Sequence, residues 1–344
     1  MKKRVALLVV VAVLAALFIF SARYLQHQWQ QPLNIDSDGY HLIVGPGQTL
    51  RSVVARLEAD GLYKHGWMLS RYGRWTGLDQ QIKRGEYLIP QGTTPIVLLR
   101  LLQKGEVISY QVTLPEGITL ARALQILAQS PELKHELSGF DDEKIATLIA
   151  PRKIAEGLFF PDSYQFERGA SDWDILRRAY KAMQAILEEE WQNREDGLPY
   201  ADAYEALVMA SIVERETGQP TERDEIAGVF VRRLNKGMRL QTDPTVIYGL
   251  GEMFDGNLTR KHLQDDTNPY NTYRHKALPP SPIALPGRAA IHAAMHPKEG
   301  ATLYFVARGD GGHYFSETLA EHQDAVRKYQ LQRRQDYRSS PKAQ

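Results

Sequence analysis

The first 22 residues constrain this chain most strongly, because they hold an apolar run with no polar face to turn toward water. Three basic residues, 2–4, precede an unbroken apolar run over residues 5–20, and two small residues extend it. A helix needs roughly 20 apolar residues to cross a bilayer, whereas the apolar core of a cleaved signal peptide has about 7–15. Basic residues favour the cytoplasmic side. The sequence therefore predicts a transmembrane helix over residues 5–22, with residues 1–4 in the cytoplasm.

The alternative is a cleaved signal peptide, which would also export the chain. Ser21 and Ala22 run directly into Arg23 and Tyr24, so no convincing small-residue cleavage site follows the apolar run. Tyr24 and Trp29 are placed to lie at the outer membrane–water interface, where aromatic rings are enriched. We therefore expect an uncleaved anchor, with the rest of the chain outside the cytoplasm.

Composition excludes several classes of function. The formal net charge is +1 and the basic residues are spread along the chain, so nothing is built to neutralise a nucleic-acid backbone. The chain has no cysteine, which removes disulfides, thiolate metal sites and cysteine nucleophiles. It also lacks a Gly-x-Ser-x-Gly nucleophile elbow and a phosphate-binding loop. We predict no cofactor and no nucleic-acid partner.

A repeated pattern follows the anchor. Polar residues 23–40 are interpreted as a stalk. Beyond them, a short strand, a Pro/Gly turn, a capping Thr and an amphipathic helix recur over residues 42–61, 87–105 and 112–130. Each unit resembles the LysM-like module, a small carbohydrate-binding fold, which predicts a LysM-like α/β region over residues 41–150. The alternative is that the pattern is only favourable turn and capping chemistry.

A second region begins near Pro151 and is predicted to be α+β. Residues 156–164 are aromatic and turn-rich, and we expect them on the surface. Apolar periodicity and turn residues predict helices over 173–191, 204–217, 224–235 and 319–334, and a hairpin of strands over 303–307 and 313–315. The second domain is predicted to cover residues 151–335, and residues 336–344 form a disordered tail.

The helix predicted over residues 204–217 carries the sharpest candidate for catalysis. Glu214 and Glu216 lie two residues apart, so they point to different sides of a helix. The residues one and two turns before Glu216 are large and apolar, and those before Glu214 are smaller. We therefore expect Glu216 on the buried stripe and Glu214 toward its edge. Burial and the C-terminal end of a helix both raise a carboxyl pKa, as a general acid requires.

A structural ion pair is the alternative reading of Glu216, with Arg232 or Arg233 of the next helix as its partner. The segments after this helix argue for a functional site, because they combine the aromatic, amide and hydroxyl groups that bind sugars. They cover residues 239–249, 270–273 and 278–283. Taken singly, each also fits turn chemistry in a proline-rich loop, and Thr245 is expected to cap a helix there.

His292 and His296 have the spacing of two metal ligands on one helix face. The pair lacks the glutamate of a zinc-protease motif, and only His313 and His322 suggest themselves as a third ligand. We predict no metal site.

Several runs of sequence resemble the endolytic murein transglycosylase family. They are Ser-Ile-Val-Glu-Arg-Glu-Thr at 211–217, Arg-Leu-Gln-Thr-Asp-Pro-Thr-Val-Ile-Tyr-Gly at 239–249, Tyr-Asn-Thr-Tyr at 270–273, Leu-Pro-Pro-x-Pro-Ile at 278–283 and Gly-Gly-His-Tyr-Phe-Ser at 311–316. The resemblance covers essentially the full length, and one departure is Ala277, where glycine is expected. It implies a single-pass enzyme of the bacterial inner membrane, with a periplasmic catalytic domain that cleaves nascent peptidoglycan strands internally and limits their length.

The resemblance also implies roles for individual residues. The catalytic glutamate falls on Glu216, which protonates the glycosidic oxygen between N-acetylmuramic acid and N-acetylglucosamine and then accepts the proton of the muramyl 6-hydroxyl as a 1,6-anhydro ring closes. The same runs supply the substrate-binding candidates Thr242, Asp243, Tyr248, Asn271, Thr272, Tyr273, Pro282, His313 and Ser316. The implied partners are peptidoglycan glycan strands, the inner membrane through the N-terminal helix, and peptidoglycan synthases.

Two other functions stay open. One is a lysozyme-type hydrolase with Glu216 and Asp243 as its two carboxyls, which such enzymes hold about 5–5.5 Å apart for retention or roughly 6.5–9.5 Å apart for inversion. The other is a non-catalytic scaffold that binds glycan through the LysM-like region and recruits partners through its anchor.

Overall fold

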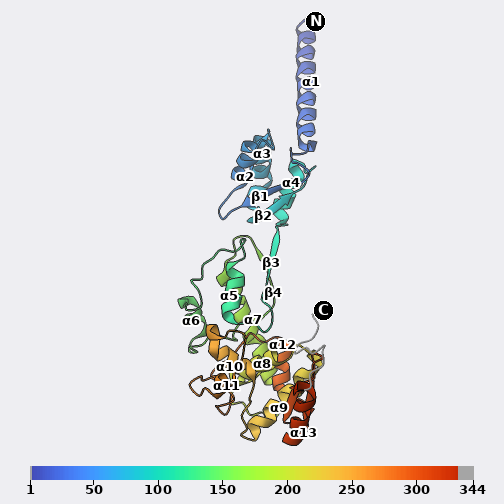
Figure 1. Ribbon diagram of the computed structural model, residues 1–344. Helices are drawn as coiled ribbons and strands as arrows, with labels where there is room; N and C mark the ends of the chain where they lie inside the picture. The colour runs from blue at the N-terminus through green and yellow to red at the C-terminus, as the bar shows by residue number, and fades with distance from the viewer. Residues whose placement is uncertain (1, 332–344) are drawn as a thin grey trace. The chain divides into compact units, whose positions relative to one another are not determined.

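The computed structural model describes residues 2–331 and contains two compact units (Figure 1). Unit 1 comprises the chain up to Tyr110 together with Gln165–Gly169, and unit 2 comprises Gln111–Tyr164 and the chain from Ala170 onward. Helices and small two-stranded sheets are mixed, as the predicted α+β class requires. The tail predicted over residues 336–344 lies outside the described residues.

Helix α1 (Lys2–Gln30) is long and apolar enough to cross a membrane. The large apolar side chains described along residues 7–20 are all exposed, so the structure gives them no protein core. The helix also continues through residues 23–30, which we had interpreted as stalk. It ends just before Pro32, which disfavours a helical conformation at the residue before it.

The rest of unit 1 is a small α/β layer. β1 (Tyr40–Val44) pairs antiparallel with β2 (Gly85–Ile89). α2 (Leu50–Ala59), α3 (Gly66–Thr76) and the 3-10 helix η1 (Leu78–Gln80) connect the two strands, and α4 (Pro95–Lys104) follows β2. Leu33 and Ile35 are 3% and 5% exposed and belong to the same core. Part of the predicted stalk is therefore folded into unit 1.

The structure does not confirm a LysM-like module over residues 41–150. Two of the three predicted strand–turn–helix units share the core of unit 1, but α3 lies between them and was not predicted. The third unit, β3 (Ser109–Thr113) with α5 (Leu120–Ala128), leads into unit 2. β3 pairs with β4 (Ser163–Glu167); two of the three boundaries between the compact units fall inside these strands, and the third follows β4 at Gly169.

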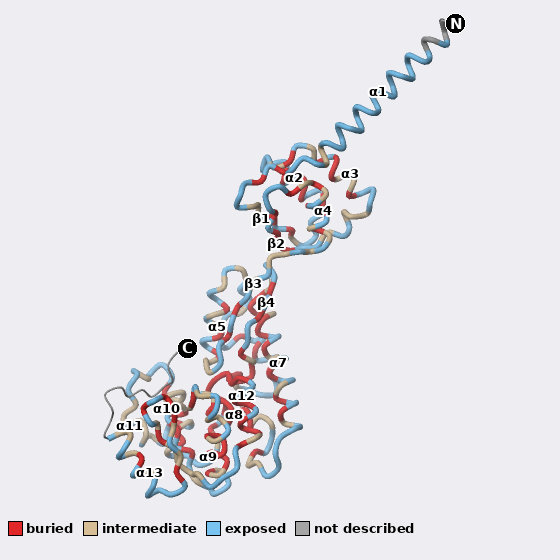
Figure 2. Tube along the Cα trace, turned by 90° about the vertical axis from the view of Figure 1, so that its right-hand side faces the viewer, coloured by how far each residue is buried: buried red, intermediate tan, exposed pale blue. Residues whose placement is uncertain are grey.

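Unit 2 is built around one central helix, α8 (Ala203–Glu216). Every residue of α8 from Ala206 to Val213 is buried (Figure 2). The helices in contact with α8 are α7 (Asp172–Gln192), α9 (Arg223–Asn235), α10 (Asp243–Leu250) and α12 (Arg288–Met295). The remaining elements are α6 (Glu143–Ile149), η2 (Pro220–Glu222), η3 (Gly251–Met253), α11 (Arg260–Gln264), β5 (Tyr304–Ala307), β6 (His313–Ser316), α13 (Leu319–Val326) and η4 (Arg327–Leu331).

The predicted helices over 173–191, 204–217 and 224–235 and the C-terminal hairpin are confirmed to within a residue or two. The prediction that residues 156–164 lie on the surface is wrong. Phe159 is fully buried and Tyr164 is 6% exposed. The ring of Phe159 packs on Tyr180 of α7, with 6.0 Å between ring centroids, so the aromatic residues of this segment serve the core of unit 2.

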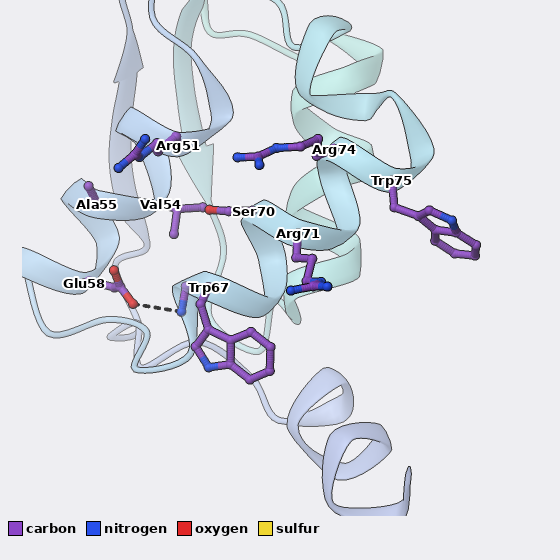
Figure 3. Close-up of a pocket in the computed structure, with 10 residues that line it drawn as sticks. Arg51, Val54, Ala55, Glu58, Trp67, Ser70, Arg71, Arg74 and Trp75 are labelled. Carbon is purple, nitrogen blue, oxygen red and sulfur yellow. Dashed lines mark hydrogen bonds between the residues drawn. The ribbon is translucent and has the colours of Figure 1, made fainter. Parts of the chain in front are cut away.

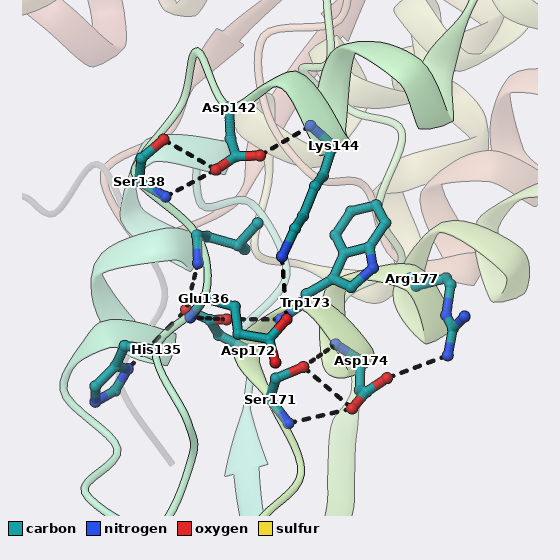
Figure 4. Close-up of polar contacts among 11 residues, drawn as sticks. His135, Glu136, Ser138, Asp142, Lys144, Ser171, Asp172, Trp173, Asp174 and Arg177 are labelled. Carbon is teal, nitrogen blue, oxygen red and sulfur yellow. Dashed lines mark hydrogen bonds and ion pairs between the residues drawn. The ribbon is translucent and has the colours of Figure 1, made fainter.

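Two buried carboxylates order the loop between α5 and α6, and one of them, Asp172, ties it to the start of α7 (Figure 4). Asp172 accepts the backbone N–H groups of Glu136 and Leu137 at 2.9 and 3.3 Å. Asp142 accepts those of Ser138 and Lys144 at 2.9 and 2.8 Å. Carboxylates are favourable at these positions because helix N-termini carry partial positive charge. The start of α7, a helix that packs on α8, is thereby fixed.

Candidate functional site

Glu216 is the last residue of α8, where the chain turns into the extended backbone of Thr217. The residue is half-buried, and burial raises the pKa of its carboxyl to about 7. The negative charge of Asp243 raises this pKa further, while the hydroxyl of Thr242 and the charge of Arg233 lower it. Glu216 is therefore a partly exposed residue whose carboxyl group is enclosed enough to be partly protonated near neutral pH.

Thr242 is the direct partner of this carboxyl. Its Oγ1 donates a hydrogen bond to Oε1 of Glu216, whereas Oε2 has no hydrogen-bond partner among residues 2–331. Thr242 is also the N-cap residue of α10, but its side chain caps no backbone N–H of that helix. The expectation that Thr245 would be the cap is wrong, because Thr245 lies within the first turn and donates to the carbonyl oxygen of Thr242 at 2.8 Å.

The backbone before Thr242 is strained. Gln241 has a φ of 55°, in the left-handed region that residues other than glycine rarely adopt. Its N–H donates to the carbonyl oxygen of Thr272 at 3.2 Å. The hydroxyl of Thr272 in turn accepts the N–H of Thr242 at 3.0 Å. These bonds hold the strained residue, and they place the hydroxyl of Thr242 on Glu216 rather than on the end of α10.

Burial does not separate Glu214 from Glu216, although we expected Glu214 toward the edge of the buried stripe. The side chain of Glu214 is only 6% exposed, and burial raises its pKa as well. α8 is buried all round, so apolar periodicity has no exposed face to reveal. The partners differ instead: Glu214 accepts the N–H of Gly287 at 3.0 Å and pairs with Arg223 at 3.4 Å.

The ion pairs suggested for Glu216 with Arg232 or Arg233 are absent among the residues that the structure describes. Both guanidinium groups donate to backbone carbonyl oxygens, Arg232 to Lys298 at 2.7 Å and Arg233 to Leu240 at 2.7 Å. Arg233 still acts on Glu216 through its charge, which lowers the pKa of the carboxyl. Glu216 is therefore the less compensated of the two glutamates of α8.

Asp243 supplies an exposed carboxylate beside this site. Its Oδ1 accepts a hydrogen bond from the hydroxyl of Tyr273 at 2.7 Å. Burial and this bond raise the pKa of the Tyr273 hydroxyl. Asp243 is exposed whereas Glu216 is largely enclosed, and the negative charge of Asp243 adds to burial in raising the pKa of Glu216.

Asn271 and Thr272 organise the segment that carries Tyr273. Asn271 is fully buried, and its amide donates to the carbonyl oxygens of His262 and Asp265 at 3.1 and 2.5 Å while its Oδ1 accepts the N–H of Tyr273 at 3.0 Å. Thr272 is 2% exposed. Their polar groups are bonded to protein, and the substrate contacts predicted for them stay predictions.

Tyr248 and Pro282 lie on the neighbouring part of unit 2. The hydroxyl of Tyr248 donates to Glu156 at 3.3 Å, and its ring packs edge-on against Tyr270 with 4.9 Å between centroids. Pro282 is buried against Gly157, where an added Cβ would come within 2.3 Å of the proline. Of these two candidates, only Tyr248 has a side chain that reaches solvent.

Glu156 is a buried carboxyl that the sequence analysis did not single out. It is 2% exposed, and it accepts the N–H of Leu120 at 2.8 Å and the hydroxyl of Tyr248. Burial raises its pKa to about 7. The signal that could have found it is the position of an acidic residue directly before Gly-Leu-Phe-Phe, an apolar run that the core requires.

His313 and Ser316 lie on β6 and have other partners. Nδ1 of His313 lies 2.8 Å from a carboxylate oxygen of Glu222, and the imidazole packs on Phe305. Ser316 is 3% exposed, and its hydroxyl has no hydrogen-bond partner within the described part of the chain. The structure does not join either residue to the carboxyl of Glu216 through a described contact, and their roles remain predictions.

The third possible metal ligand beside His292 and His296, at the end of α12, is Glu190, rather than the predicted His313 or His322. Nδ1 of His292 lies 2.8 Å from Oε2 of Glu190, and the rings of His292 and His296 stack with 4.2 Å between centroids. The three ligand atoms lie within 4.8 Å of one another, which is compact enough for a metal ion. Arg288 pairs with the other oxygen of Glu190 at 3.2 Å and with Glu189 at 2.5 Å, and the prediction of no metal site stays a prediction.

The sequence is similar to a known family and to named proteins. The sequence matches the YceG-like family over residues 42–328. It is 28% identical over 319 residues to a Bacillus subtilis (strain 168) protein named endolytic murein transglycosylase, covering 87% of each chain. A protein of the same name from Streptococcus pneumoniae (strain D39) is 28% identical over 352 residues, covering 92% of this chain and 63% of that one.

A solved structure is similar as well. The crystal structure of a YceG-like protein from Listeria monocytogenes aligns with a TM-score of 0.54 at 29% identity, covering 84% of this chain and 99% of that one. The family match covers most of both compact units and leaves out α1, the residues between α1 and Leu42, and the chain from residue 329 onward. This chain belongs to the YceG-like family.

Proposed function

We propose that this protein is a murein transglycosylase anchored in the bacterial inner membrane, with Glu216 as its acid and base. The relatives that carry this activity in their names align over most of the chain. The observation that carries the proposal is the state of Glu216, a partly buried residue whose carboxyl pKa is raised by burial to about 7 and whose Oε2 has no hydrogen-bond partner among residues 2–331. A general acid works best when its pKa lies near the working pH.

The proposed reaction needs one carboxyl group. Protonated Glu216 donates its proton to the glycosidic oxygen between N-acetylmuramic acid and N-acetylglucosamine as the bond from C1 to that oxygen breaks. The 6-hydroxyl of the muramyl residue attacks C1, and the Glu216 carboxylate accepts the hydroxyl proton. The net change moves one proton from the 6-oxygen to the leaving oxygen and closes a 1,6-anhydro ring, and no water is consumed.

The exposed groups beside Glu216 are the proposed contacts with the glycan. Tyr248 and Tyr273 offer partly exposed rings, which can stack on the apolar faces of sugars, and Asp243 offers an acceptor for hydroxyl groups. Thr242, Asn271 and Thr272 then act by holding these groups and Glu216 in place, as their bonds to protein indicate.

The same proposal covers location and biological role. α1 holds the protein in the inner membrane, and the catalytic domain, residues 151–335, acts in the periplasm on nascent strands, where internal cleavage ends their elongation. Peptidoglycan synthases in the same membrane are the proposed neighbours. Residues 111–150 fold with this domain, because they belong to unit 2.

Mass spectrometry of reaction products tests the proposal directly. Full-length protein in detergent is incubated with purified, uncrosslinked glycan strands, alongside Glu216→Gln and Glu156→Gln variants. The wild type and Glu156→Gln should release new ends that carry 1,6-anhydromuramic acid, and Glu216→Gln should not. Circular dichroism of each variant checks that it is folded. Absence of cleavage by folded wild type would contradict the proposal and favour the scaffold function.

A hydrolase is the second candidate, because Asp243 places an exposed carboxylate close enough to act on the pKa of Glu216. A hydrolase would leave reducing ends, one water heavier than the anhydro products. In that case Asp243→Asn should abolish cleavage. A transglycosylase should retain cleavage in Asp243→Asn, with its pH profile shifted.

A further inference from the structure

Unit 1 carries a groove lined by arginine and tryptophan between α2 and α3 (Figure 3). Its volume is about 830 Å³. Arg51 lies on α2, and Trp67, Arg71, Arg74 and Trp75 lie on α3. The four residues of α3 are spaced by four, seven and eight positions from Trp67, so they share one side of the helix. We call this set of five residues the Arg/Trp groove.

The charge of the groove is uncompensated. Arg51, Arg71 and Arg74 have no described ion pair or side-chain hydrogen bond in residues 2–331. The acidic residue in the lining is Glu58, and its carboxylate already accepts the N–H of Gly66 at 2.9 Å. Guanidinium groups bind phosphate through paired hydrogen bonds. The groove therefore suits an anionic ligand with phosphate groups.

The tryptophans indicate what kind of surface the ligand belongs to. Trp67 is 60% exposed and Trp75 is 82% exposed, and Figure 3 shows both rings projecting away from their helix. Large exposed aromatic side chains usually mark an interaction surface. Tryptophan beside basic residues is the composition found where proteins meet the headgroups of a bilayer.

The position of α3 relative to α1 also favours a contact with the membrane surface. Within unit 1, Tyr24 of α1 packs on His65, which precedes α3, and Trp29 packs on Tyr72 of α3, with 6.3 and 5.0 Å between ring centroids. Tyr24 lies only two residues, roughly 3 Å along a helix, beyond the apolar run. The headgroup layer on each side of a bilayer is about 5–7 Å thick. With α1 across a bilayer, the start of α3 would lie at the level of the headgroups, and Tyr72, which packs on Trp29 roughly 10 Å beyond the apolar run, would lie just outside them.

We propose that the Arg/Trp groove binds the headgroups of anionic phospholipids, so that α3 lies on the outer surface of the membrane that α1 crosses. This second membrane contact rests on the proposed anchoring by α1 and is separate from the chemistry of Glu216. It would hold unit 1 down on the bilayer instead of leaving it free on a helical stalk. A glycan could also stack on the tryptophans, but contacts with Tyr24 and Trp29 place the groove beside the membrane.

The absence of cysteine makes the proposal testable at single positions. Ser70→Cys places a fluorophore in the groove, and Ile43→Cys places one on the exposed side of β1 as a matched control in the same unit. Each labelled full-length chain is reconstituted into nanodiscs of phosphatidylcholine, with or without phosphatidylglycerol, that contain lipids with a nitroxide on the headgroup. Flotation with vesicles tests the anchor separately.

The fluorophore at residue 70 should be quenched at least twofold more than the one at residue 43 in the discs with phosphatidylglycerol. Adding Arg71→Glu and Arg74→Glu should remove this difference. A chain that floats but shows equal quenching at the two positions would overturn the groove proposal while leaving the anchor intact. Quenching that is independent of lipid charge would also overturn it. Relief of quenching by glycan strands would assign the groove to glycan instead, and failure to float would overturn the anchor itself.

Discussion

The ends of two helices in unit 2 each hold a carboxyl whose pKa burial raises to about 7, yet their surroundings differ. Glu216 is the last residue of α8 and is partly buried, with one described hydrogen bond, from Thr242 to Oε1. Glu156 lies in the segment between α6 and β4, against the first residue of α5, and is 2% exposed. Both of its oxygens are occupied, one by the N–H of Leu120 and the other by the hydroxyl of Tyr248.

The comparison shows that a raised pKa reports burial, while access and free lone pairs decide what a carboxyl can do. Glu156 bonds the N-terminus of α5 to Tyr248, so its oxygens serve the fold. Glu216 keeps one oxygen without a described protein partner and lies beside an exposed carboxylate, Asp243. Of these two carboxyls, Glu216 is the one that keeps an oxygen without a described hydrogen bond, as its proposed role as acid and base requires.

The largest expected effect is a difference in kcat between the Glu216 and Glu156 variants. Glu216→Gln should lower kcat on glycan strands by about 10²–10⁴-fold, the usual contribution of a general acid and base. Glu156→Gln should stay within about tenfold of wild type, because glutamine keeps the acceptor oxygen for Leu120. Initial rates at pH 7, with thermal melts to verify folding, measure both. Equal losses in the two variants would break the comparison.

The next effect concerns stability against pH. The pKa of Glu156 is about 7 in the folded chain, against 4.5 for an ordinary glutamate. The folded state therefore holds this proton more tightly, so the associated stability is fully present below pH 4.5 and is lost as pH rises toward 7. The difference corresponds to about 3 kcal/mol. Between pH 4.5 and 7.5 the free energy of unfolding of the wild type should therefore fall by about 3 kcal/mol more than that of Glu156→Gln.

Hydrogen exchange of peptides from the buried helix α8, corrected for intrinsic exchange rates, measures this loss of stability at each pH. Glu86 provides an internal contrast, because hydrogen bonds and the charge of Arg168 lower its pKa to about 2 despite burial. Its contribution is fully present above pH 4.5 and is lost progressively as pH falls from 4.5 toward 2, and peptides of unit 1, to which Glu86 belongs, report it. A pH dependence in Glu156→Gln that matches wild type would show that this carboxyl is not the source.

Local patterns explain what the sequence could predict. Apolar periodicity and capping residues lie close together in the chain, so the helices α7, α8 and α9 and the β5–β6 hairpin were predicted to within a residue or two. The end of α8 at Glu216 follows from the same kind of pattern, with Gly218 just beyond. The sequence therefore predicted Glu216 as the candidate acid, but not the residues that surround its carboxyl.

Long-range contacts explain what the sequence could not predict. The burial of Glu156 depends on Leu120 and Tyr248, which lie 36 and 92 residues away. The cap of α10 was misplaced because Thr242 bonds to Glu216 instead of its own helix, a contact across 26 residues. Periodicity also failed to rank Glu214 against Glu216, since α8 is buried on all sides. These contacts form only when the whole unit folds.

A smaller effect tests the one hydrogen bond that Glu216 receives. The hydroxyl of Thr242 stabilises the charged carboxylate and so lowers the pKa of Glu216. Thr242→Val removes the donor with little change in shape, and the pKa should rise. The alkaline limb of the kcat profile should then move to higher pH, while Thr242→Ser, which keeps a hydroxyl, should follow wild type. Coincident profiles for the two variants would mean that this bond does not tune the acid.

The smallest effect concerns the loop that contacts the surroundings of both carboxyls. Tyr270 of this loop packs on Tyr248, the partner of Glu156, and Tyr273 bonds to Asp243, which lies beside Glu216. Ala277 in this loop has a φ of 69°, which explains why glycine was expected there. A left-handed conformation costs alanine about 1–2 kcal/mol, and glycine loses roughly 0.5–1 kcal/mol more entropy on folding. Ala277→Gly should therefore stabilise unit 2 by about 0.5 kcal/mol.

A matched substitution at a helical alanine, expected to change stability in the opposite direction, serves as the control for Ala277→Gly. Ala289 is exposed on α12 with helical backbone, so Ala289→Gly should destabilise by about 1 kcal/mol. Hydrogen exchange of α8 peptides compares both variants with wild type under one condition. If Ala277→Gly also raises kcat, the strained alanine limits how Tyr273 is presented beside Glu216. If stability rises while kcat is unchanged, the loop already holds Tyr273 in its working position, and the strain at Ala277 reaches neither carboxyl.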